Sequence, residues 1–511
     1  MKKTAKKKVT RQAHASSSRG RTAKTNKPSP PPAKAQGRRP RAPASTTQNT
    51  AASGARTGGS QSSGSLRVRM YRVGFGDFFL LTVPSPAGPQ HILIDCGVHA
   101  GNIGSMDDCV KDLMTTTGGK FALVVATHYH ADHLSGFASN YADFAQCEVG
   151  AVWITNRLDP KDSSTVKFRA QITSLANQLA LQLAARADHD AKQALDKVHN
   201  ALGAAGGGNA KALQLLTEGF KNKPPVYYYQ AGDDPTLPAS LQGVLTVQVL
   251  GPPPKSSQGA YAVSDNRTEQ YLAAASQEEP TVAGHLNPFE KWIGSAQEYP
   301  ADAFRAYRTE EQIKNKQPGT PQQLEKILQG VQPDALAATA DALDGTLNNQ
   351  SLVLLFTCQG RKLLFVGDAQ WGNWEYWLYG KPVTGKDPGI TESAKSILGS
   401  IDFYKVGHHG STNATPIPAA EALNPNCAAM CSTETGYPSE KRTYGSLAKG
   451  TEVPRTKLMD ALEKQLKNKL VRSDWIAAGN AKACPEAHQE LKDLPDNFSQ
   501  GTIYIDYVFP E

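Results

Sequence analysis

Three imidazoles and one carboxylate lie within six residues of this chain, in the segment 128–133 with the sequence His-Tyr-His-Ala-Asp-His. The segment directly follows the apolar run 121–126, which is typical of a buried strand. Neutral imidazoles and carboxylates bind zinc and similar divalent ions, and two such ions side by side can turn water into a nucleophile. The sequence therefore predicts a metal-binding loop at a strand end, with a hydrogen-bonded surface loop as the alternative.

The first 65 residues differ in composition from the rest of the chain. They hold 15 of the 55 lysines and arginines and none of the 47 acidic residues, although the whole chain carries a net charge of only +8. They are rich in Lys, Ala, Ser, Pro and Gly, so they can bury too little apolar surface to offset chain entropy. We predict a disordered basic tail over 1–65 and a folded domain over 66–511.

The basic tail allows two interpretations. A flexible polybasic arm could attract DNA or RNA by neutralising phosphates, without sequence selectivity. It could equally be a solubilising leader or a plain linker. Nucleic acid is therefore a candidate partner, and the sequence leaves both interpretations open.

Seven cysteines are spread along the chain without a Cys-x-x-Cys pair. An odd number of scattered cysteines favours a reducing compartment. The basic start is followed by Ser, Pro and Gly rather than by an apolar stretch, and no 18 apolar residues run together. We therefore expect a cytoplasmic protein that neither is secreted nor crosses a membrane.

Alternating apolar residues predict a layered α/β body. Strands are expected at 66–73 and 78–83, around a Gly-Phe-Gly-Asp turn, and this arrangement is typical of a hairpin. A third strand at 91–94 is followed by a helix over 105–114 and by the strand that delivers the histidine segment. Strands and helices therefore alternate along this part of the chain.

Two stretches interrupt this alternation, and we interpret them as insertions at about 160–240 and 255–346. Leucines and an isoleucine at helical spacing predict a helix over 166–203, which the glycines 206–208 interrupt before a second helix near 210–220. The second insertion is polar, with helical patches at 302–316 and 322–328. Further strands are predicted at 243–250, 351–357, 362–366, 401–406, 427–431 and 502–509, and a helix at 455–467.

Three further groups with metal-binding side chains follow predicted strands. Asp95 follows the third strand, Asp368 ends a Val-Gly-Asp sequence after 362–366, and His408 and His409 follow 401–406. Each alone could be a polar turn residue. With the histidine segment present, a shared metal site becomes the better interpretation.

The order of these groups resembles that of the metallo-β-lactamase superfamily. Within it the chain most resembles the soluble hydrolase domain of bacterial competence proteins, which take up DNA. The narrower resemblance rests on the segments 73–77, 348–354, 405–411 and 437–439. It spans about 66–509, and it implies a four-layer αββα sandwich with helical insertions.

The resemblance implies a role for each residue of the cluster. His128 and His130 would bind a first divalent ion, and Asp132 and His133 a second. Asp368 would bridge the two ions, and the small Gly367 before it lets the backbone approach closely. The expected cofactors are two zinc ions, with manganese as the alternative.

One residue of the His408-His409 pair should complete the ligands, and the sequence does not tell which. We assign His408 to the metal and place His409 near the substrate. Ser411 and nearby backbone N–H groups would then receive an anionic oxygen. The predicted catalytic residues are thus Asp132, His409 and Ser411.

Two aspartates are candidates for supporting roles. Asp95 matches a family residue that supports the histidine segment without touching the metal. Asp77, in the Gly-Phe-Gly-Asp turn, could do similar work or be an ordinary turn residue.

The chain departs from the superfamily at one ligand position. Many members carry a further histidine just before the strand that precedes the bridging aspartate, but the segment 345–351 contains none. The first ion would then lack a protein ligand or use water or Asn349 instead. His285 is the nearest histidine upstream, and we do not expect it to be a ligand because it lies in a polar insertion.

The leading hypothesis is a metal-dependent phosphodiesterase or nuclease that uses a metal-bound hydroxide. The same metals could instead act on a carbonyl group, in a lactone, a thioester or a β-lactam. A third possibility is a protein without catalytic activity that binds a metal and nucleic acid.

Overall fold

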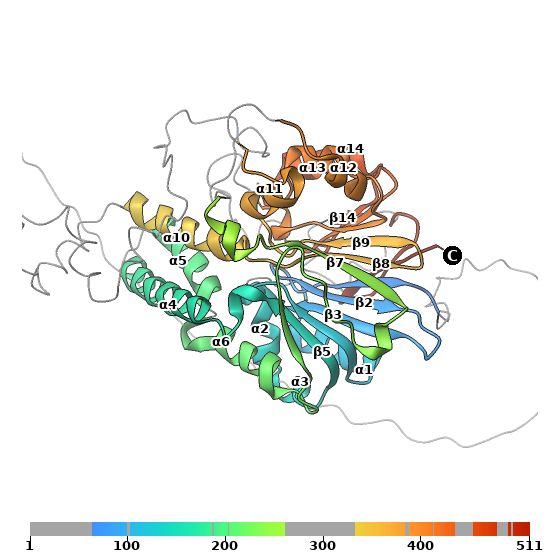
Figure 1. Ribbon diagram of the computed structural model, residues 1–511, viewed down its shortest axis with the longest axis horizontal. Coiled ribbons are helices and arrows are strands. Elements are labelled where there is room, and N and C mark those ends of the chain that lie inside the picture. Colours follow the sequence, from blue (N-terminus) through green and yellow to red (C-terminus); the bar gives the residue numbers. More distant parts are fainter. Residues whose placement is uncertain are drawn as a thin grey trace, which may run out of the picture. The chain divides into compact units, whose positions relative to one another are not determined.

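The computed structural model describes residues 64–99, 103–185, 189–202, 204–260, 333–383, 388–411, 413–434, 453–477, 489–491 and 494–510. All of them belong to one compact unit that begins at Ser60. Two large β-sheets lie at its centre, with helices packed against them (Figure 1). The predicted mixed α/β class is therefore confirmed.

The first sheet has eight strands, and its order places residues from both ends of the unit side by side. Neighbouring strands are antiparallel from β15 to β3 and parallel from β3 to β6. In spatial order the strands are β15 (Phe498–Gln500), β16 (Tyr504–Val508), β1 (Arg67–Tyr71), β2 (Phe78–Val83), β3 (Gln90–Cys96), β4 (Lys120–Ala126), β5 (Glu148–Thr155) and β6 (Val226–Tyr229).

The second sheet has six strands. They are antiparallel from β7 to β9 and parallel from β9 to β12. In spatial order they are β12 (Leu470–Arg472), β11 (Ala428–Cys431), β10 (Phe403–Lys405), β9 (Arg361–Phe365), β8 (Val353–Cys358) and β7 (Leu245–Gly251). The strands β13 (Trp475–Ala477) and β14 (Gln489–Leu491) form a separate pair.

The main hydrophobic core lies between the two sheets. It includes Phe79 and Trp153 of the first sheet and Phe356 and Phe365 of the second, all fully buried. The other face of each sheet packs against helices, so both faces of both sheets are apolar. On the first sheet these are α1 (Met106–Thr117), α2 (Ala131–Ser139) and α3 (Tyr141–Phe144), and on the second α11 (Trp371–Tyr379), α12 (Glu392–Leu398), α13 (Ile417–Ala422) and α14 (Thr456–Gln465).

Three helices form a further core of their own, which we call the helical unit. It consists of α4 (Ser163–Ala184), α5 (His189–Leu202) and α10 (Pro333–Asn348). Leucines, alanines and Val198 pack between the three helices. The helix α6 (Ala204–Gln214) connects this unit to α2. Both predicted insertions thus contribute to one helical body beside the sheets (Figure 1).

Most predicted elements are present, with shifted ends. The hairpin of β1 and β2 is confirmed, and the predicted helix at 105–114 is α1, which Ser105 caps by accepting a hydrogen bond from Asp108 N. The long helix predicted at 166–203 is two helices, α4 and α5. The strands predicted at 243–250, 351–357, 362–366, 401–406, 427–431 and 502–509 correspond to β7, β8, β9, β10, β11 and β16, and the helix at 455–467 to α14.

Three expectations about the insertions are wrong. The glycines 206–208 do not interrupt a helix but lie inside α6, because packing of α6 on α2 outweighs their low helix propensity. The strand β6 lies within the first predicted insertion and nevertheless joins the first sheet. The end of the second insertion is not a polar segment but the Ala-rich helix α10, whose apolar face is buried.

Several predictions fall outside the described residues. They concern the tail, the helical patches at 302–316 and 322–328, His285 and the segment 437–439. The six cysteines in the described part of the chain are free and buried, and the reducing compartment and the cytoplasmic location stay predictions. None of the described helices is long and apolar enough to span a membrane.

A buried ion pair joins two neighbouring strands of the first sheet, β1 and β16, and yields a stability prediction. Arg69 of β1 donates to both carboxylate oxygens of Asp506 of β16, each at 2.8 Å. Asp506→Ala would remove two charged hydrogen bonds and leave Asp112 as the remaining carboxylate partner of the guanidinium, so we expect the free energy of unfolding to fall by about 1.5–3 kcal/mol. Urea denaturation followed by circular dichroism measures the change.

The exposed pair of Glu148 and Lys221 provides the control for this variant. Glu148→Ala should leave the denaturation midpoint almost unchanged, because water screens exposed ion pairs. Equal effects of the two substitutions would contradict the prediction.

Candidate metal centre

The candidate site lies where the carboxyl ends of parallel strands from both sheets meet. In the first sheet Asp95 lies at the end of β3, and the histidine segment follows β4. In the second sheet Asp368 follows β9, and His409 follows β10. Since parallel strands end at the same edge of their sheet, topology alone brings these distant segments together.

Close approach of backbone segments shapes the site. A Cβ atom on Gly97 would lie 2.4 Å from the backbone nitrogen of His133, so only glycine fits there. Asp77 N donates to Asp132 O at 2.8 Å, and Gly97 N donates to Asp77 O at 3.0 Å. The loops that follow β1, β3 and β4 are thereby bound to one another.

Three imidazoles of the site are anchored through Nδ1. His133 Nδ1 lies 2.7 Å from Asp95 Oδ2, and His409 Nδ1 lies 2.8 Å from the carbonyl oxygen of Ser432. His128 Nδ1 lies 3.1 Å from the hydroxyl of Thr127. Bonds to the carboxylate and carbonyl require a proton on Nδ1, so Nε2 of His133 and His409 faces another partner, with a lone pair in the neutral ring and with a second N–H in the protonated ring.

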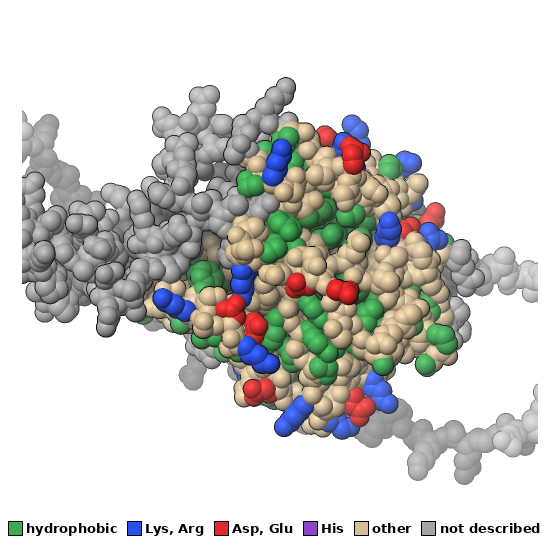
Figure 2. All heavy atoms as spheres, viewed as in Figure 1, with side chains coloured by type: hydrophobic (Ala, Val, Ile, Leu, Met, Phe, Trp, Pro, Cys, Tyr) green, Lys and Arg blue, Asp and Glu red, His purple; other side chains and the backbone are tan. Residues whose placement is uncertain are grey.

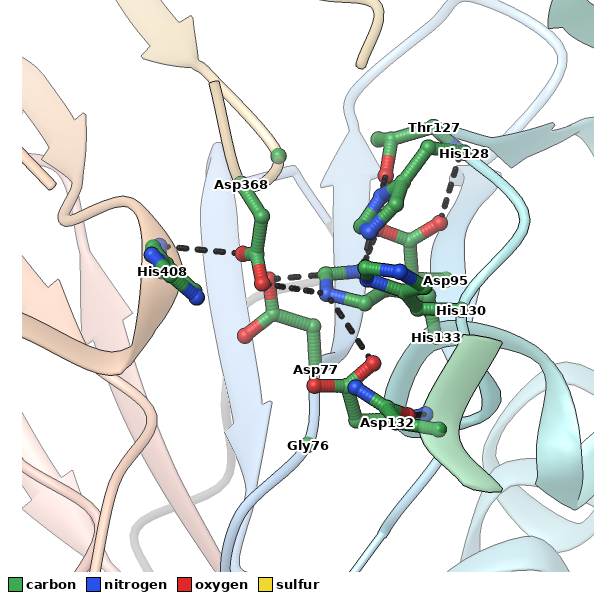
Figure 3. A network of polar contacts seen from close by, with 12 residues as sticks. Gly76, Asp77, Asp95, Thr127, His128, His130, Asp132, His133, Asp368 and His408 are labelled. Atoms are coloured by element: carbon green, nitrogen blue, oxygen red, sulfur yellow. Dashed lines mark hydrogen bonds and ion pairs between the residues drawn. The ribbon is translucent and has the colours of Figure 1, made fainter. Parts of the chain in front are cut away.

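The free ring nitrogens face two carboxylates. His133 Nε2 lies 3.1 Å from Asp368 Oδ2, and His409 Nε2 lies 3.1 Å from Asp132 Oδ2. Figure 3 shows Asp368 turned toward His133 and the other labelled residues of the histidine segment. Ligand atoms of His128, Asp132, His133 and Asp368 all lie within 4.8 Å of one another.

Several of these atoms are buried without a hydrogen-bond partner among the described residues. They are His128 Nε2, His130 Nε2 and Asp132 Oδ1, and also His133 Nε2 and Asp368 Oδ2, which face each other at 3.1 Å as an ion pair without forming a hydrogen bond. Burying so many polar atoms without partners is costly, unless a ligand satisfies them together. The donors are the nitrogen and oxygen ligands that divalent metal ions bind, so these residues could hold a metal ion.

The structure separates His408 from His409. Both have left-handed backbone conformations, with φ of 42° and 52°, which non-glycine residues rarely adopt. As a result the ring of His409 lies in the cluster, whereas the ring of His408 contacts Asn413, Ser411 and Asn348. His408 reaches Asp368 only through its backbone N–H, at 2.9 Å, from the side away from the histidine segment (Figure 3).

Ser411 and Asn349 also lie apart from the cluster. The hydroxyl of Ser411 donates to Asn413 Oδ1 at 2.6 Å and lies 2.7 Å from His408 Nδ1. The side-chain oxygen of Asn349 accepts from Asn373 N at the start of α11. The structure therefore places these two residues around the site and does not bring their side chains to the facing imidazoles.

Asp77 and Lys405 form a buried ion pair at the base of the site. Lys405 Nζ pairs with Asp77, donates to Gly367 O at 2.9 Å and lies 3.5 Å from Asp368 Oδ1. Asp77 is thus part of the site and not an isolated turn residue. Lys405 was not predicted to be part of the site, because it stands in an otherwise apolar strand.

Two asparagines of the helical insertion hold the backbone of the histidine segment. Asp132 N donates to the side-chain oxygen of Asn200 in α5, at 3.1 Å. Asn209 of α6 donates from its side chain to Tyr129 O at 2.6 Å. Sequence reasoning missed both residues, since a polar residue on a predicted helix usually faces solvent.

The facing charges shift the protonation equilibria of the site. Burial alone would lower the pKa of His133, but the carboxylates of Asp368 and Asp95 outweigh it and raise that pKa well above its usual range. The pKa of His409 is raised for the same reason, against its burial. Burial would raise the pKa of Asp368, yet the neighbouring imidazoles lower it well below its usual range.

Comparison with known proteins adds no family assignment. No protein-family model matches the chain, and no curated protein matches it. The evidence for a metal site is therefore the geometry of the buried histidine and aspartate cluster.

The raised pKa values of His133 and His409 predict a pH dependence of the metal-free protein. Above about pH 6.5 the histidines of the unfolded chain are neutral, whereas the folded state keeps protons on these two. The folded state then binds more protons, so its stability should fall as the pH rises from about 6.5 to 8. Each retained proton contributes up to about 1.4 kcal/mol per pH unit.

Urea denaturation in the presence of a chelator, at several pH values in this interval, measures the slope. His409→Gln should make the slope shallower, because it removes one of the two protonated groups. A metal-free protein that becomes more stable across the interval would exclude the proposed protonation states.

Proposed function

We propose that this protein is a metal-dependent hydrolase of the metallo-β-lactamase type, and that phosphodiesters are its substrates. The observation that carries the proposal is the convergence of buried, unpartnered imidazole nitrogens and carboxylate oxygens on one point. The two sheets with helices on their outer faces agree with the four-layer αββα sandwich that the resemblance implies. The position of the site at the carboxyl ends of the strands of both sheets also agrees with such a sandwich.

The cluster offers ligands for two ions. His128 and His130 would hold the first, and Asp132 and His133 the second. Asp368 would help to hold both, because one of its oxygens lies within 4.8 Å of ligand atoms of His128, Asp132 and His133. Zinc suits this mixture of imidazole and carboxylate groups, and manganese is the alternative.

We assign the remaining imidazole ligand to His409 in place of His408. His409 Nε2 lies 3.1 Å from Asp132 and 3.6 Å from Asp368, so it can share an ion with both. His408 is more exposed, and its ring is held by polar neighbours outside the cluster. It is therefore the better candidate for contact with the substrate, with Ser411 supporting its ring.

The chemistry needs a nucleophile and stabilisation of negative charge. A pair of divalent ions would supply a water activated at neutral pH and would offset charge developing on phosphorus. Asp95 orients His133 from behind, and Lys405 compensates the charge of Asp77 and Asp368. These contacts keep the ligands in place before any substrate binds.

The preference for phosphodiesters, and for DNA or RNA as the polymer, rests on the competence-type resemblance and the basic tail. On the face of the molecule that Figure 2 shows, lysine and arginine side chains are interspersed with acidic ones over the described residues. Attraction of a polyanion would then come from the 15 basic residues of 1–65. Hydrolysis of a carbonyl substrate, and metal binding without catalysis, are the alternatives that assays must separate.

The first test is metal content and hydrolysis. The purified protein should take up divalent ions and cleave a small phosphodiester, bis-p-nitrophenyl phosphate, faster than a lactone. Asp132→Asn and His133→Gln should each lower the rate at least about 100-fold, because removing even an outer partner of a metal ligand costs 10–100-fold. Metal analysis by mass spectrometry should show ions lost in the same variants.

Asp341→Asn is the matched control, because Asp341 pairs with Lys197 on the exposed side of α10. This variant should bind as much metal as the wild type and hydrolyse the phosphodiester at the same rate. A wild-type protein that takes up no divalent ion would overturn the proposal. If the protein cleaved the lactone faster than the phosphodiester, its substrates would be carbonyl compounds and the phosphodiester assignment would be wrong.

The second test concerns the tail. A variant that begins at Leu66 should bind single-stranded DNA more weakly, with a smaller dependence of the affinity on salt, because fewer phosphates are neutralised. Its rate on the small phosphodiester should stay unchanged. Fluorescence anisotropy at several salt concentrations measures the affinity, and an unchanged salt dependence would exclude the tail as a polyanion-binding arm.

A further inference from the structure

Apart from His128, His130 and Asp368, the first ion would lack a protein ligand from the position where many superfamily members carry a histidine. In this chain helix α10 ends at that position, and its last turns approach the histidine segment. Asp344 Oδ1, on α10, lies 3.9 Å from His130 Nε2. The side chain of Asp344 is 14% exposed, and that of His130 is 1% exposed.

We propose that Asp344 is a further protein ligand of the ion held by His128 and His130, beside Asp368. This inference rests on the proposed function, because it assigns a ligand within the same metal site. It replaces the expectation of water or Asn349 at this position.

The separation of Asp344 Oδ1 from His130 Nε2 allows these two atoms to share an ion. Two donors that each lie about 2.0–2.1 Å from a tetrahedral zinc ion are roughly 3.3–3.4 Å apart. The observed separation of 3.9 Å exceeds this by about half an ångström, which a small rotation of the carboxylate can supply. His128 Nε2 and His130 Nε2 are both buried without a hydrogen-bond partner in the described structure, so the nitrogen ligands are available.

A neighbouring side chain fixes the orientation of the carboxylate. Asn348, one turn further along α10, donates from Nδ2 to Asp344 Oδ2 at 3.0 Å. This bond occupies one carboxylate oxygen and leaves Oδ1 facing His130. Asn348 is fully buried, and its Nδ2 also lies 3.3 Å from His408 Nε2. Hydrogen bonds of this kind to a ligating carboxylate are typical of metal sites.

The competing candidate is already engaged elsewhere. The side-chain oxygen of Asn349 accepts a hydrogen bond from Asn373 N at 2.9 Å. It therefore holds the start of α11 and would have to give up that bond to reach an ion. A carboxylate is also a stronger ligand for a divalent ion than a neutral amide oxygen.

The helical unit holds Asp344 in position. Leu343 and Leu347 of α10 are buried against α4 and α5, on either side of Asp344 in the sequence. A ligand on a packed helix has little freedom to leave the site. The end of the second insertion would then supply a ligand of the first metal site.

The test compares Asp344→Ala with Asp341→Ala. Asp341 lies on the same helix, its side chain is 58% exposed, and it pairs with Lys197 at 2.5 Å. Zinc is titrated into the metal-stripped proteins, bound zinc is counted by mass spectrometry, and affinity is measured by competition with a chromophoric chelator. We expect Asp344→Ala to hold one ion fewer, or to hold it at least about tenfold more weakly, while Asp341→Ala matches the wild type.

Two further measurements distinguish a ligand from a structural residue. Asp344→His should restore the lost ion, since imidazole is a zinc ligand. Thermal denaturation with and without zinc should show that Asp344→Asn, which keeps the shape of the side chain, loses stability mainly in the zinc-loaded form. Equal losses in both forms would assign Asp344 a structural role and overturn the inference.

Failure of the inference differs from failure of the proposed function. If Asp344→Ala keeps the wild-type zinc content and affinity, Asp344 is not a ligand, and the metal-dependent hydrolase stands. If the wild-type protein itself binds no zinc or manganese, the proposed function fails together with the inference.

Discussion

The structure depends on charge compensation at one buried point. Four aspartates with almost no solvent exposure, Asp77, Asp95, Asp132 and Asp368, gather at the ends of two sheets. Such a group can be buried only if positive charge lies among the carboxylates. Lys405 supplies part of it, and protonated imidazoles supply the rest when no metal is bound. The same arrangement could hold a divalent ion, because an ion can take the place of the protons.

Both the sheets and the inserted helices position residues of the candidate site. Parallel strands deliver the ligands to one edge, and glycine at position 97 lets the loops approach within bonding distance. The inserted helices then hold the histidine segment from outside, through Asn200 and Asn209. The insertions are therefore part of the site, although their sequence shows no metal-binding motif.

The sequence revealed the parts of the site that short spacing encodes. The histidine segment is recognisable because its ligands lie within six residues after an apolar strand, and Asp368 because it ends another strand. The sequence could not tell which of His408 and His409 faces the cluster. That depends on the left-handed backbone conformation of both residues, which their residue type does not predict. Asp344, Lys405 and Asn200 were missed because each is a single polar residue in a helix or strand. The prediction that the glycines 206–208 interrupt a helix was wrong, because packing of α6 against α2 stabilises the helix in spite of them.

The pairing of β1 with β16 has a consequence for biosynthesis. Arg69 and its partner Asp506 are separated by 437 residues. At 5–20 residues per second, a ribosome takes roughly 20–90 s to synthesise that stretch. During this time one side of β1 has no strand to pair with, and an open strand edge is prone to pair with other chains. We therefore expect the nascent chain to depend on chaperones until its last strand emerges.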